Sequence, residues 1–487
     1  MEQQPTAPTT RRGHLLRILS HPRSYLISLL GSLLAVFPYP RLLILSVLLS
    51  NYIISTRWLL PLIATKLVER STIRITGGSI ENPQDGTVDM KMKGEVTDAG
   101  PIDASIRFNG PVKLGYEDVD GEIVVVGEAE GMPAIDARGG NASLDASVRV
   151  RITDTAAFGL FAETMVQSQE FELVLMADDM TVLVMGLLPI HHVQMRKTLV
   201  MRGLDGLSDI QILTAVATKG TSDYIELSTS CVLHNPSDLT IAMGDVVLEM
   251  FHTVHCVGSV EMKDLCLQPG KNVVSCSAKY APQTAEQARA GRVLLGQYVT
   301  GAASKVTIKG SLTKSTKFDY LAPALASLNV TTTLPGEQRK MITRTQLVID
   351  PFRLAMLQSA TRLELFNPME APVSILWMKG RVVCRGEVIG HLNEDLAAKN
   401  QIIVVEPNQH QLTGTMSMRL RISPAAVTAI MAAGFAGGGK GSAPAALPHS
   451  GMTLFDVDVE STLGCRVGDY FVELDYRQET VPVGIFG

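Results

Sequence analysis

A long apolar stretch near the N-terminus, residues 25–63, constrains this chain more than any other part of its sequence. A bilayer core of about 30 Å is crossed by roughly 20 apolar residues in a helix, and residues 42–60 supply that length with one charge, Arg57. Arginine can extend its guanidinium to the headgroups, and tryptophan is typical of the interface. We therefore predict one span within an anchor of residues 25–65, with Arg57 and Trp58 at the membrane interface.

The first run of this stretch, residues 25–37, is too short to cross a bilayer alone, and Pro38 and Pro40 follow it. Proline removes a helix donor and disfavours helix at the residue before it. We interpret this run as an interfacial helix. The alternative is a two-helix hairpin, which would place the rest of the chain on the other side of the membrane. A secretory signal peptide is disfavoured because the apolar stretch is too long and no A-x-A-like cleavage site follows.

The short tail before the anchor, residues 1–24, is basic. Its arginines are Arg11, Arg12, Arg17 and Arg23. The positive-inside rule then favours a cytoplasmic N-terminus and a lumenal or extracellular body. Asn141 and Asn329 stand in N-x-S/T triplets, so they are possible glycosylation sites in such a compartment.

The remaining composition excludes some classes of function. A net charge of −5 and a pI near 6.1, with no basic tract beyond the tail, give no sign of nucleic-acid binding. The cysteines contain no C-x-x-C pair, so a zinc ribbon and a thioredoxin-like site lack support. In an oxidising lumen they are possible disulfides, with the pairing open. The cysteines are Cys231, Cys256, Cys266, Cys276, Cys384 and Cys465.

Downstream of the anchor the hydrophobic pattern changes to a period of two. Val88, Met90 and Met92 alternate with charged residues, which predicts a half-buried antiparallel strand. The same alternation returns in residues 144–152 and 416–422. A mainly β fold follows from these strands.

The strands belong to an internal repeat. Residues 148–157 and 418–427 match class by class: an alternating strand, a capping Thr or Ser, and an Ala-rich helix start. Residues 276–285 occupy the same place in the middle of the chain, with Pro282 suited to a first helical turn. We therefore expect one helix in each repeated unit, followed by another strand.

An Asn-Pro pair recurs upstream of each helix, and we predict that it closes an apolar strand, since proline has no N–H and asparagine can bond the turn backbone. The pairs are Asn82 and Pro83, Asn235 and Pro236, and Asn367 and Pro368. They define three tandem immunoglobulin- or fibronectin-like β-sandwich units of residues 71–206, 207–336 and 337–487, each of a length typical of such a unit.

Residues 79–104 (SIENPQDGTVDMKMKGEVTDAGPIDA) resemble fungal membrane proteins with tandem late-embryogenesis-abundant type 2 domains, a branch of unknown function. Residues 60–72 resemble that family's junction between span and first domain, and residues 232–241 and 365–375 resemble later copies of its motif. The resemblance implies fibronectin-like sandwiches in the lumen of a vacuole or lysosome-like organelle. It also implies a part in vacuolar signalling or the ending of autophagy, and a lipid held in a groove of the sandwich. It supplies no catalytic residues.

Two patterns that suggest other sites are weak. In residues 434–442 a phosphate loop would need Ser or Thr after Lys440, yet Gly441 stands there, so a flexible linker is favoured. His252, with Cys256 on the same face of a strand, fits a disulfide or buried thiols better than a zinc site. No catalytic motif occurs, so we predict no enzyme activity, no cofactor and no metal site.

Apolar surface is the remaining candidate for function. Methionine side chains are adaptable. Nine methionines lie on predicted strands or at their ends, and we expect most of them in the sandwich cores and the rest along a lipid-accepting groove. They are Met90, Met92, Met176, Met180, Met185, Met243, Met250, Met416 and Met418. We predict a non-enzymatic protein whose partners are the bilayer, a lipid ligand, and protein partners or further copies of itself. The alternative is a structural tether or adhesion module that binds no lipid.

Overall fold

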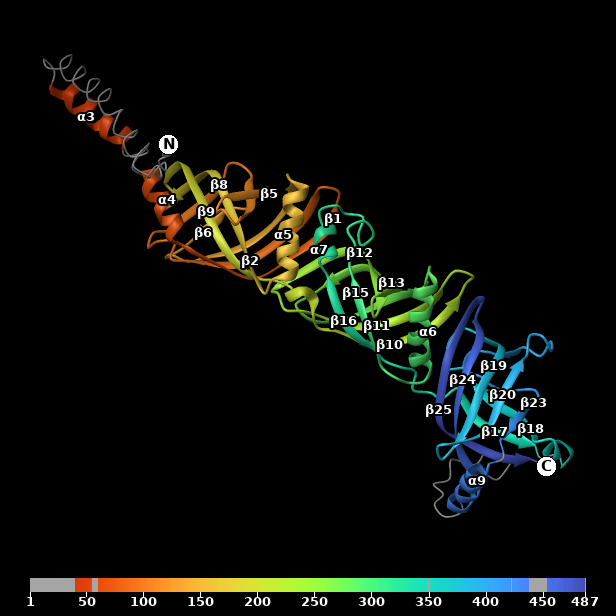
Figure 1. Ribbon diagram of the computed structural model, residues 1–487. Helices are drawn as coiled ribbons and strands as arrows, with labels where there is room; N and C mark the ends of the chain where they lie inside the picture. Colours follow the sequence, from red (N-terminus) through yellow and green to blue (C-terminus); the bar gives the residue numbers. More distant parts are fainter. Residues whose placement is uncertain (1–39, 55–59, 349–350, 422, 438–452, 487) are drawn as a thin grey trace, which may run out of the picture.

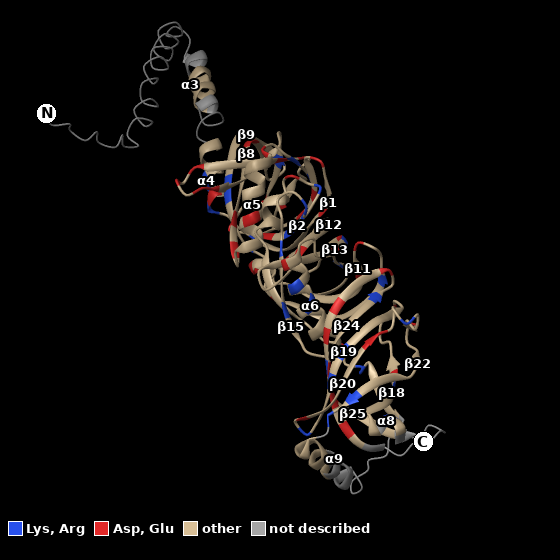
Figure 2. Cartoon of the chain, turned by 45° about the vertical axis from the view of Figure 1, so that its right-hand side comes forward, with Lys and Arg blue, Asp and Glu red and all other residues tan. Residues whose placement is uncertain are grey.

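A computed structural model describes residues 40–54, 60–348, 351–421, 423–437 and 453–486. The chain forms three β units in a row, with α3 and α4 at one end and the third unit at the other (Figure 1). The prediction of a mainly β protein is confirmed. Acidic and basic residues are interspersed over all three units (Figure 2), in keeping with a small net charge.

In the described part of the chain, two helices precede the first strand. Helix α3 spans Pro40–Ile54 and α4 spans Leu60–Arg70. Arg57 and Trp58, predicted at the membrane interface, lie outside the described residues, as do residues 1–39. Among the residues that are described, none of the helices has both the length and the apolar character that a membrane span needs. Of the predicted span, residues 42–54 belong to α3 and Leu60 is the first described residue of α4, while residues 55–59 lie outside the described residues.

The first unit surrounds α5 with nine strands. Its elements are β1 (Thr72–Gln84), β2 (Thr87–Thr97), β3 (Ala104–Phe108), β4 (Val112–Glu117), β5 (Ile123–Glu130), β6 (Ile135–Ala137), β7 (Ala142–Ile152), α5 (Thr155–Gln167), β8 (Glu170–Val184) and β9 (Leu188–Arg202). Strand β8 pairs along one edge with β4 and then β3, and along the other with β9. The β2–β3 connection therefore crosses from one face of the unit to the other.

The second unit repeats this order. Its elements are β10 (Ile210–Gly220), β11 (Ile225–Asn235), β12 (Leu239–His252), β13 (His255–Leu267), β14 (Gly270–Tyr280), α6 (Ala285–Val299), β15 (Ser304–Lys309), α7 (Ala322–Ala326) and β16 (Asn329–Leu334). Strand β12 pairs in parallel with β1 at residues 78–80, so the first two units share one 16-stranded sheet. A short 3-10 helix, Asp205–Leu207, lies at the predicted boundary between them.

The third unit closes on itself. Its elements are β17 (Ile342–Val348), α8 (Pro351–Ala355), β18 (Gln358–Phe366), β19 (Val373–Cys384), β20 (Glu387–Asp395), β21 (Ile403–Val405), β22 (His410–Leu412), β23 (Met416–Leu420), α9 (Pro424–Gly437), β24 (Thr453–Val467) and β25 (Tyr470–Phe486). Strand β17 pairs with both β25 and β18, which closes the path from β17 through β25 to β18 into a ring.

The three units have equivalent elements. In each, a hairpin (β1–β2, β10–β11 or β17–β18) is followed by a crossover to the opposite face, and a strand then leads into a helix (α5, α6 or α9) and a second hairpin-like pair (β8–β9, β15–β16 or β24–β25). The short helices α7 and α8 are additional, so the expectation of one helix per unit is too simple.

The long helices begin at side-chain caps. Thr284 caps α6 in a capping box with Gln287, and Ser423 Oγ accepts a hydrogen bond from the Ala426 N–H at 3.0 Å in α9. In α5 the cap is Asp154, whose carboxylate accepts from the Ala157 N–H at 2.9 Å, rather than a neighbouring Thr. Asp is as good an N-cap as Thr, and it stands where its side chain reaches the third helical N–H.

Each later unit packs its crossover end on the unit before it. Between units two and three, the N–H groups of Glu370 and Ala371 donate to the Ala217 carbonyl at 2.9 and 3.2 Å. Arg292 on α6 bonds the Asp475 carboxylate of β25 at 2.7 Å. Between units one and two, the rings of Phe158 and Tyr320 meet edge to face with centroids 5.4 Å apart. All three units therefore point the same way along the row.

A candidate apolar ligand cavity

An apolar cavity lies at the crossover end of the first unit, beneath α4. Its volume is about 210 Å³. Leu60, Ile63 and Leu67 line it from α4, and strand residues such as Ile106, Ala137 and Ile190 line it from below. An apolar cavity of roughly 150 Å³ stays dry and accepts benzene, so this one has room for part of a hydrocarbon chain.

Helix α4 is fixed over the cavity by Lys197 of β9. The Lys197 side chain is buried, and its Nζ donates to the backbone oxygen of Glu69 at 2.7 Å and to that of Ser71. Burial lowers the pKa of this amine, while the Glu69 carboxylate opposes the shift. A cation at the C-terminal carbonyls of a helix also complements the helix dipole. The helix is thus held at its C-terminal end, next to the first strand.

The cavity wall offers almost no polar chemistry. Ser71 is the hydroxyl residue on it, and its Oγ donates to the Val68 carbonyl at 2.7 Å. The buried side-chain atoms that lack a hydrogen-bond partner among the described residues belong to residues elsewhere: Ser79, Asp179, His234, Tyr320, Thr345, Thr361 and Ser461. A ligand here is therefore bound by its hydrocarbon part.

Three other apolar cavities are much smaller. One of about 50 Å³ lies between α5 and α7, one of about 20 Å³ in the second unit, and one of about 30 Å³ inside the third. A wider open cleft of about 700 Å³ separates α6 from the third unit, but charged groups line it, and Arg292 and Arg381 there are paired with carboxylates. Ligand-sized apolar space is concentrated at the α4 end.

Two of the three Asn-Pro pairs occupy the same structural place. Asn367 is buried, its Nδ2 donates to the carbonyls of Ala371 and Val405, both at 2.9 Å, and its Oδ1 accepts from the Met369 N–H at 3.0 Å. Asn235 repeats this pattern. Each asparagine fills the crossover turn of its unit.

The first Asn-Pro pair lies at a different structural place from the other two. Asn82 is exposed with φ 50°, and Pro83 stands beside it in a bulge of β1, which continues to Gln84. The prediction that Asn82 and Pro83 end a strand is therefore wrong for the first unit. Its crossover turn is instead the segment between β2 and β3, where Gly100, Pro101 and Ile102 line the large cavity. Where the later units have a buried asparagine, the first has the cavity's mouth.

Sequence reasoning missed this site. The groove was expected among methionines, yet seven of the nine pack in or against the cores and Met176 is half-buried. Met195, which was not among them, is the methionine that lines the cavity. Residues 60–63 were assigned to the anchor because they are apolar, whereas Leu60 and Ile63 form part of the cavity wall. Pro61, which suits the first turn of a helix, was the available signal.

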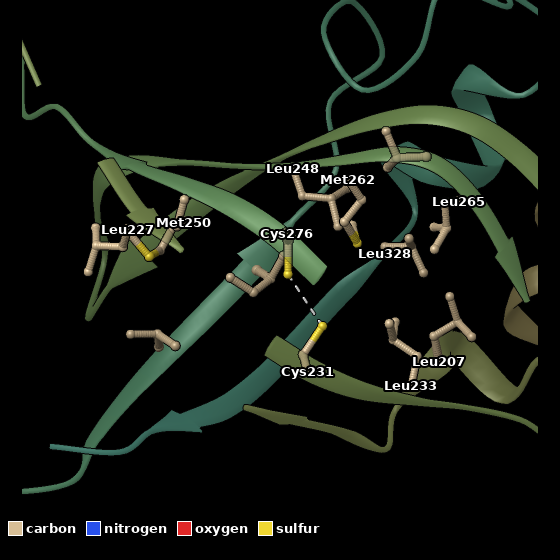
Figure 3. Close-up of a cluster of buried hydrophobic side chains, with 14 of the residues drawn as sticks. Leu207, Leu227, Cys231, Leu233, Leu248, Met250, Met262, Leu265, Cys276 and Leu328 are labelled. Carbon is tan, nitrogen blue, oxygen red and sulfur yellow. Dashed lines mark hydrogen bonds between the residues drawn. The ribbon is translucent and has the colours of Figure 1, made fainter. Parts of the chain in front are cut away.

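The cysteines form no disulfide: all six are free thiols. Cys231 on β11 and Cys276 on β14 face one another in the second unit's core, with sulfur atoms 3.5 Å apart against about 2.05 Å in a disulfide (Figure 3). The hydrogen bond with Cys276, and then burial, raise the pKa of the Cys231 thiol. Cys256 and Cys266 lie nearer the surface, while Cys384 and Cys465 are buried in the third unit.

The other sequence candidates fall at separate places. Asn141 and Asn329 are both exposed, at a turn beside Arg138 and at the start of β16. His252 and His255 face each other across the β12–β13 hairpin, so the expected single strand is in fact a turn, and His252 Nδ1 lies 3.2 Å from the Lys305 carbonyl oxygen. Within the described ranges, His, Cys, Asp and Glu nowhere gather in a group of three that could hold a metal ion. The Gly-rich residues 438–442 lie outside the described residues.

One part of the chain matches a known protein family. Residues 131–250, which are 120 of the 487 residues, match a family described as a protein of unknown function (DUF3712). The match begins before β6 and ends in β12, so it includes α5, the first junction between units and the buried Asn235 turn. No curated protein matches the chain.

Solved structures show only distant similarity. The BSP domain of a biofilm-associated protein aligns with 86% of this chain and 69% of its own length at 9% identity and a TM-score of 0.15. A β-glucuronidase of glycoside hydrolase family 2 aligns at 12% identity, 56% and 26% coverage and a TM-score of 0.18. The exo-chitosanase CsxA of Amycolatopsis orientalis aligns at 14% identity, 54% and 26% coverage and a TM-score of 0.16. Scores this low carry no argument about function.

Proposed function

We propose that this is a non-enzymatic, membrane-anchored protein that holds the hydrocarbon chain of a membrane lipid in the cavity under α4. The supporting observation is the cavity itself: about 210 Å³ of apolar space, beside the helix that follows the apolar N-terminal segment. Filling such a space with a hydrocarbon chain removes apolar wall and ligand surface from water, at roughly 25 cal/mol per Å².

The proposed setting follows from the sequence. The basic N-terminal tail favours a cytoplasmic N-terminus and a lumenal body. The resemblance to fungal proteins with late-embryogenesis-abundant type 2 domains favours a vacuolar or related endomembrane, with a part in lipid handling or autophagy-related signalling. The cavity position suits this setting because the ligand would enter from the membrane side of the body.

Photo-crosslinking tests the proposal. The full chain is reconstituted in vesicles that contain a phospholipid with a diazirine on its acyl chain, and the cross-linked peptides are mapped by mass spectrometry. We expect cross-links on cavity peptides, such as residues 102–108 and 135–137, in addition to the anchor, which serves as the internal positive control. Cross-links confined to residues 25–54 would reject a lipid in the cavity.

A matched pair of variants sharpens this test. Ala137 and Asp136 are neighbours on β6, and Ala137 is buried on the cavity wall while Asp136 is exposed on the other face. Ala137→Phe places a ring in the cavity and is expected to abolish the cavity cross-links. Asp136→Phe adds the same ring outside and is expected to leave them unchanged. Equal effects of the two variants would count against the cavity as the binding site.

A tether without lipid is the second candidate, favoured by the row of three units that places α9 far from α3 (Figure 1). It predicts the same cross-links on the anchor and none in the cavity. It also predicts that Ala137→Phe leaves every membrane and partner contact of the protein intact.

A further inference from the structure

The mouth of the cavity carries a rim of exposed apolar side chains. The rim residues, with their exposed fractions, are Leu62 (57%), Ile63 (44%) and Leu67 (39%) of α4, Ile102 (47%) of the β2–β3 loop, and Met185 (69%), Leu187 (86%) and Leu188 (39%) of the β8–β9 hairpin. The loop and the hairpin are joined, since the Met185 N–H donates to the Asp103 carbonyl at 2.8 Å. Ile63, Leu67, Ile102 and Leu188 also line the cavity, so the rim surrounds its opening.

The hairpin tip is unusual in its sequence. Met185 and Gly186 both have positive φ, 51° and 69°, and the Leu187 N–H donates to the Val184 carbonyl at 3.0 Å, which closes a turn within the three-residue loop between β8 and β9. The first position of this turn strongly favours Asn, Asp or Gly, because other side chains are strained there. Methionine takes the strained position and still leaves its side chain mostly exposed. Packing among the described residues therefore does not account for an apolar residue at this tip.

In the later units, the connection equivalent to the β8–β9 hairpin is covered by the unit before it. The β24–β25 turn of the third unit is bonded to the second, where the Asp469 N–H donates to the Gly220 carbonyl at 3.2 Å. The β15–β16 connection of the second unit packs α7 on α5 of the first. The first unit has only α4 in that place among the described residues. Its rim is thus the one crossover end that the described chain leaves largely uncovered.

The chain itself restricts what can cover the rim. Five residues separate Ile54, the end of α3, from Leu60, the start of α4. An extended chain of that length reaches at most about 22 Å. Helix α3 has no charged residue after Arg41, and its described side chains Ile44, Leu45, Leu48 and Leu49 are 58–60% exposed. A bilayer around α3 would therefore lie within reach of the rim.

We propose that the rim docks on the bilayer that holds the anchor, so that the cavity opens directly into the hydrocarbon phase. This rests on the proposed function, because it takes α3 as part of a membrane anchor. The hairpin tip of Met185, Gly186 and Leu187 enters the headgroup region and the α4 side chains lie at its surface, as apolar faces do at a membrane interface. A lipid chain can then pass between leaflet and cavity without crossing water.

Depth-dependent fluorescence quenching tests the docking. Leu187→Trp places an indole on the rim, and Val119→Trp is the matched control, since Val119 is also fully exposed, in the β4–β5 turn of the same unit. Val119 lies far from the rim. Ala104, at the rim, pairs with Val184 of β8, whereas Gly115, four residues before Val119, pairs with Val174. These two β8 residues are ten positions apart, about 33 Å of strand. The full-length variants are reconstituted in phosphatidylcholine vesicles with and without brominated acyl chains, and the signal of the parent chain is subtracted.

We expect a blue-shifted emission and strong quenching for Leu187→Trp and neither for Val119→Trp. Equal quenching of the two would overturn the docking. A blue shift without quenching would also overturn it, because a protein surface, such as a second copy, would then cover the rim. Flotation and acyl-chain cross-linking of the same samples show whether the docking alone has failed or the proposed function as well. A chain that floats and cross-links in its cavity but shows no quenching refutes the docking alone, whereas a chain that does not float refutes both proposals.

A second pair of changes tests what the docking does. Asparagine tolerates the positive φ of residue 185 better than methionine does, so Met185→Asn combined with Leu187→Ser removes the apolar tip without straining the hairpin. We expect slower acquisition of the photoreactive lipid by the cavity and an unchanged amount at equilibrium. An unchanged rate would show that the tip has no part in lipid entry.

Discussion

Asn367 is expected to be a major source of stability in the third unit. Replacing it with alanine removes three hydrogen bonds and leaves two carbonyl oxygens and one N–H unpaired in a buried turn. Each buried unpaired group costs about 1–3 kcal/mol. Allowing for partial relaxation of the turn, we expect Asn367→Ala to lower the free energy of unfolding of this unit by about 3–4 kcal/mol. For a unit of this size that is a fall in melting temperature of roughly 10 °C.

Intrinsic fluorescence measures this unit selectively. The chain has two tryptophans, and Trp377 lies in β19 of the third unit, so a Trp58→Phe background leaves one reporter there. The control is Asn82→Gly, which removes an exposed hydrogen bond to Asp89 and keeps the positive φ available. This control is expected to change the free energy of unfolding by no more than about 0.5 kcal/mol. An unmoved Trp377 transition in Asn367→Ala, or a shift no larger than the control's, would refute the idea that the buried asparagine stabilises the crossover turn.

Three further predictions follow from the packing and burial of individual residues. A Cβ on Gly220 would lie 1.6 Å from the Val467 carbonyl oxygen, so Gly220→Ala should loosen the junction of the second and third units and raise hydrogen exchange in the β24–β25 turn, with exchange at α4 as the control. Burial raises the pKa of Tyr298 from its ordinary value of 10.0 to about 12, and the unfolded chain therefore loses this proton first. Stability should be unaffected below pH 10 and fall between about pH 10 and 12, less steeply in Tyr298→Phe, by denaturant titration. Iodoacetamide at pH 8 should label exposed Cys266 and spare Cys465, whose pKa burial raises to about 12; rapid labelling of Cys465 would contradict its burial.

Local sequence patterns predicted the elements better than their assembly. Alternation such as that of Val88 and Met92 is visible along the chain because period two is a property of one strand, and β2 lies where it was expected. The side-chain caps and Ala-rich starts of the helices are equally local. Strand pairing depends on contacts far apart in sequence, so the parallel β1–β12 pairing and the ring closure at β17 had no signature in any short segment.

The Asn-Pro pairs show where such reasoning misleads. The dipeptide indicates a turn, and a turn is what it makes at Asn235 and Asn367. At Asn82 the same two residues form a bulge near the end of a hairpin, because the strand pairing with β2 continues beyond them to Gln84. The sequence signal is the same in both cases, and the difference lies in which neighbouring strand supplies the hydrogen bonds. The candidate cavity was missed for the same reason, since its wall is assembled from α4 and strands distributed over some 135 residues.

The contrast between the units gives the cavity a physical explanation. In the second and third units the crossover turn is filled by a buried asparagine whose three bonds fix the loop, and the turn is then covered by the preceding unit. The first unit has neither a filling asparagine at its crossover nor a preceding unit among the described residues, and its apolar interior remains open beneath α4. A cavity at one end of a row of similar units therefore needs no new fold. It requires only that the crossover turn of the first unit lack the filling residue.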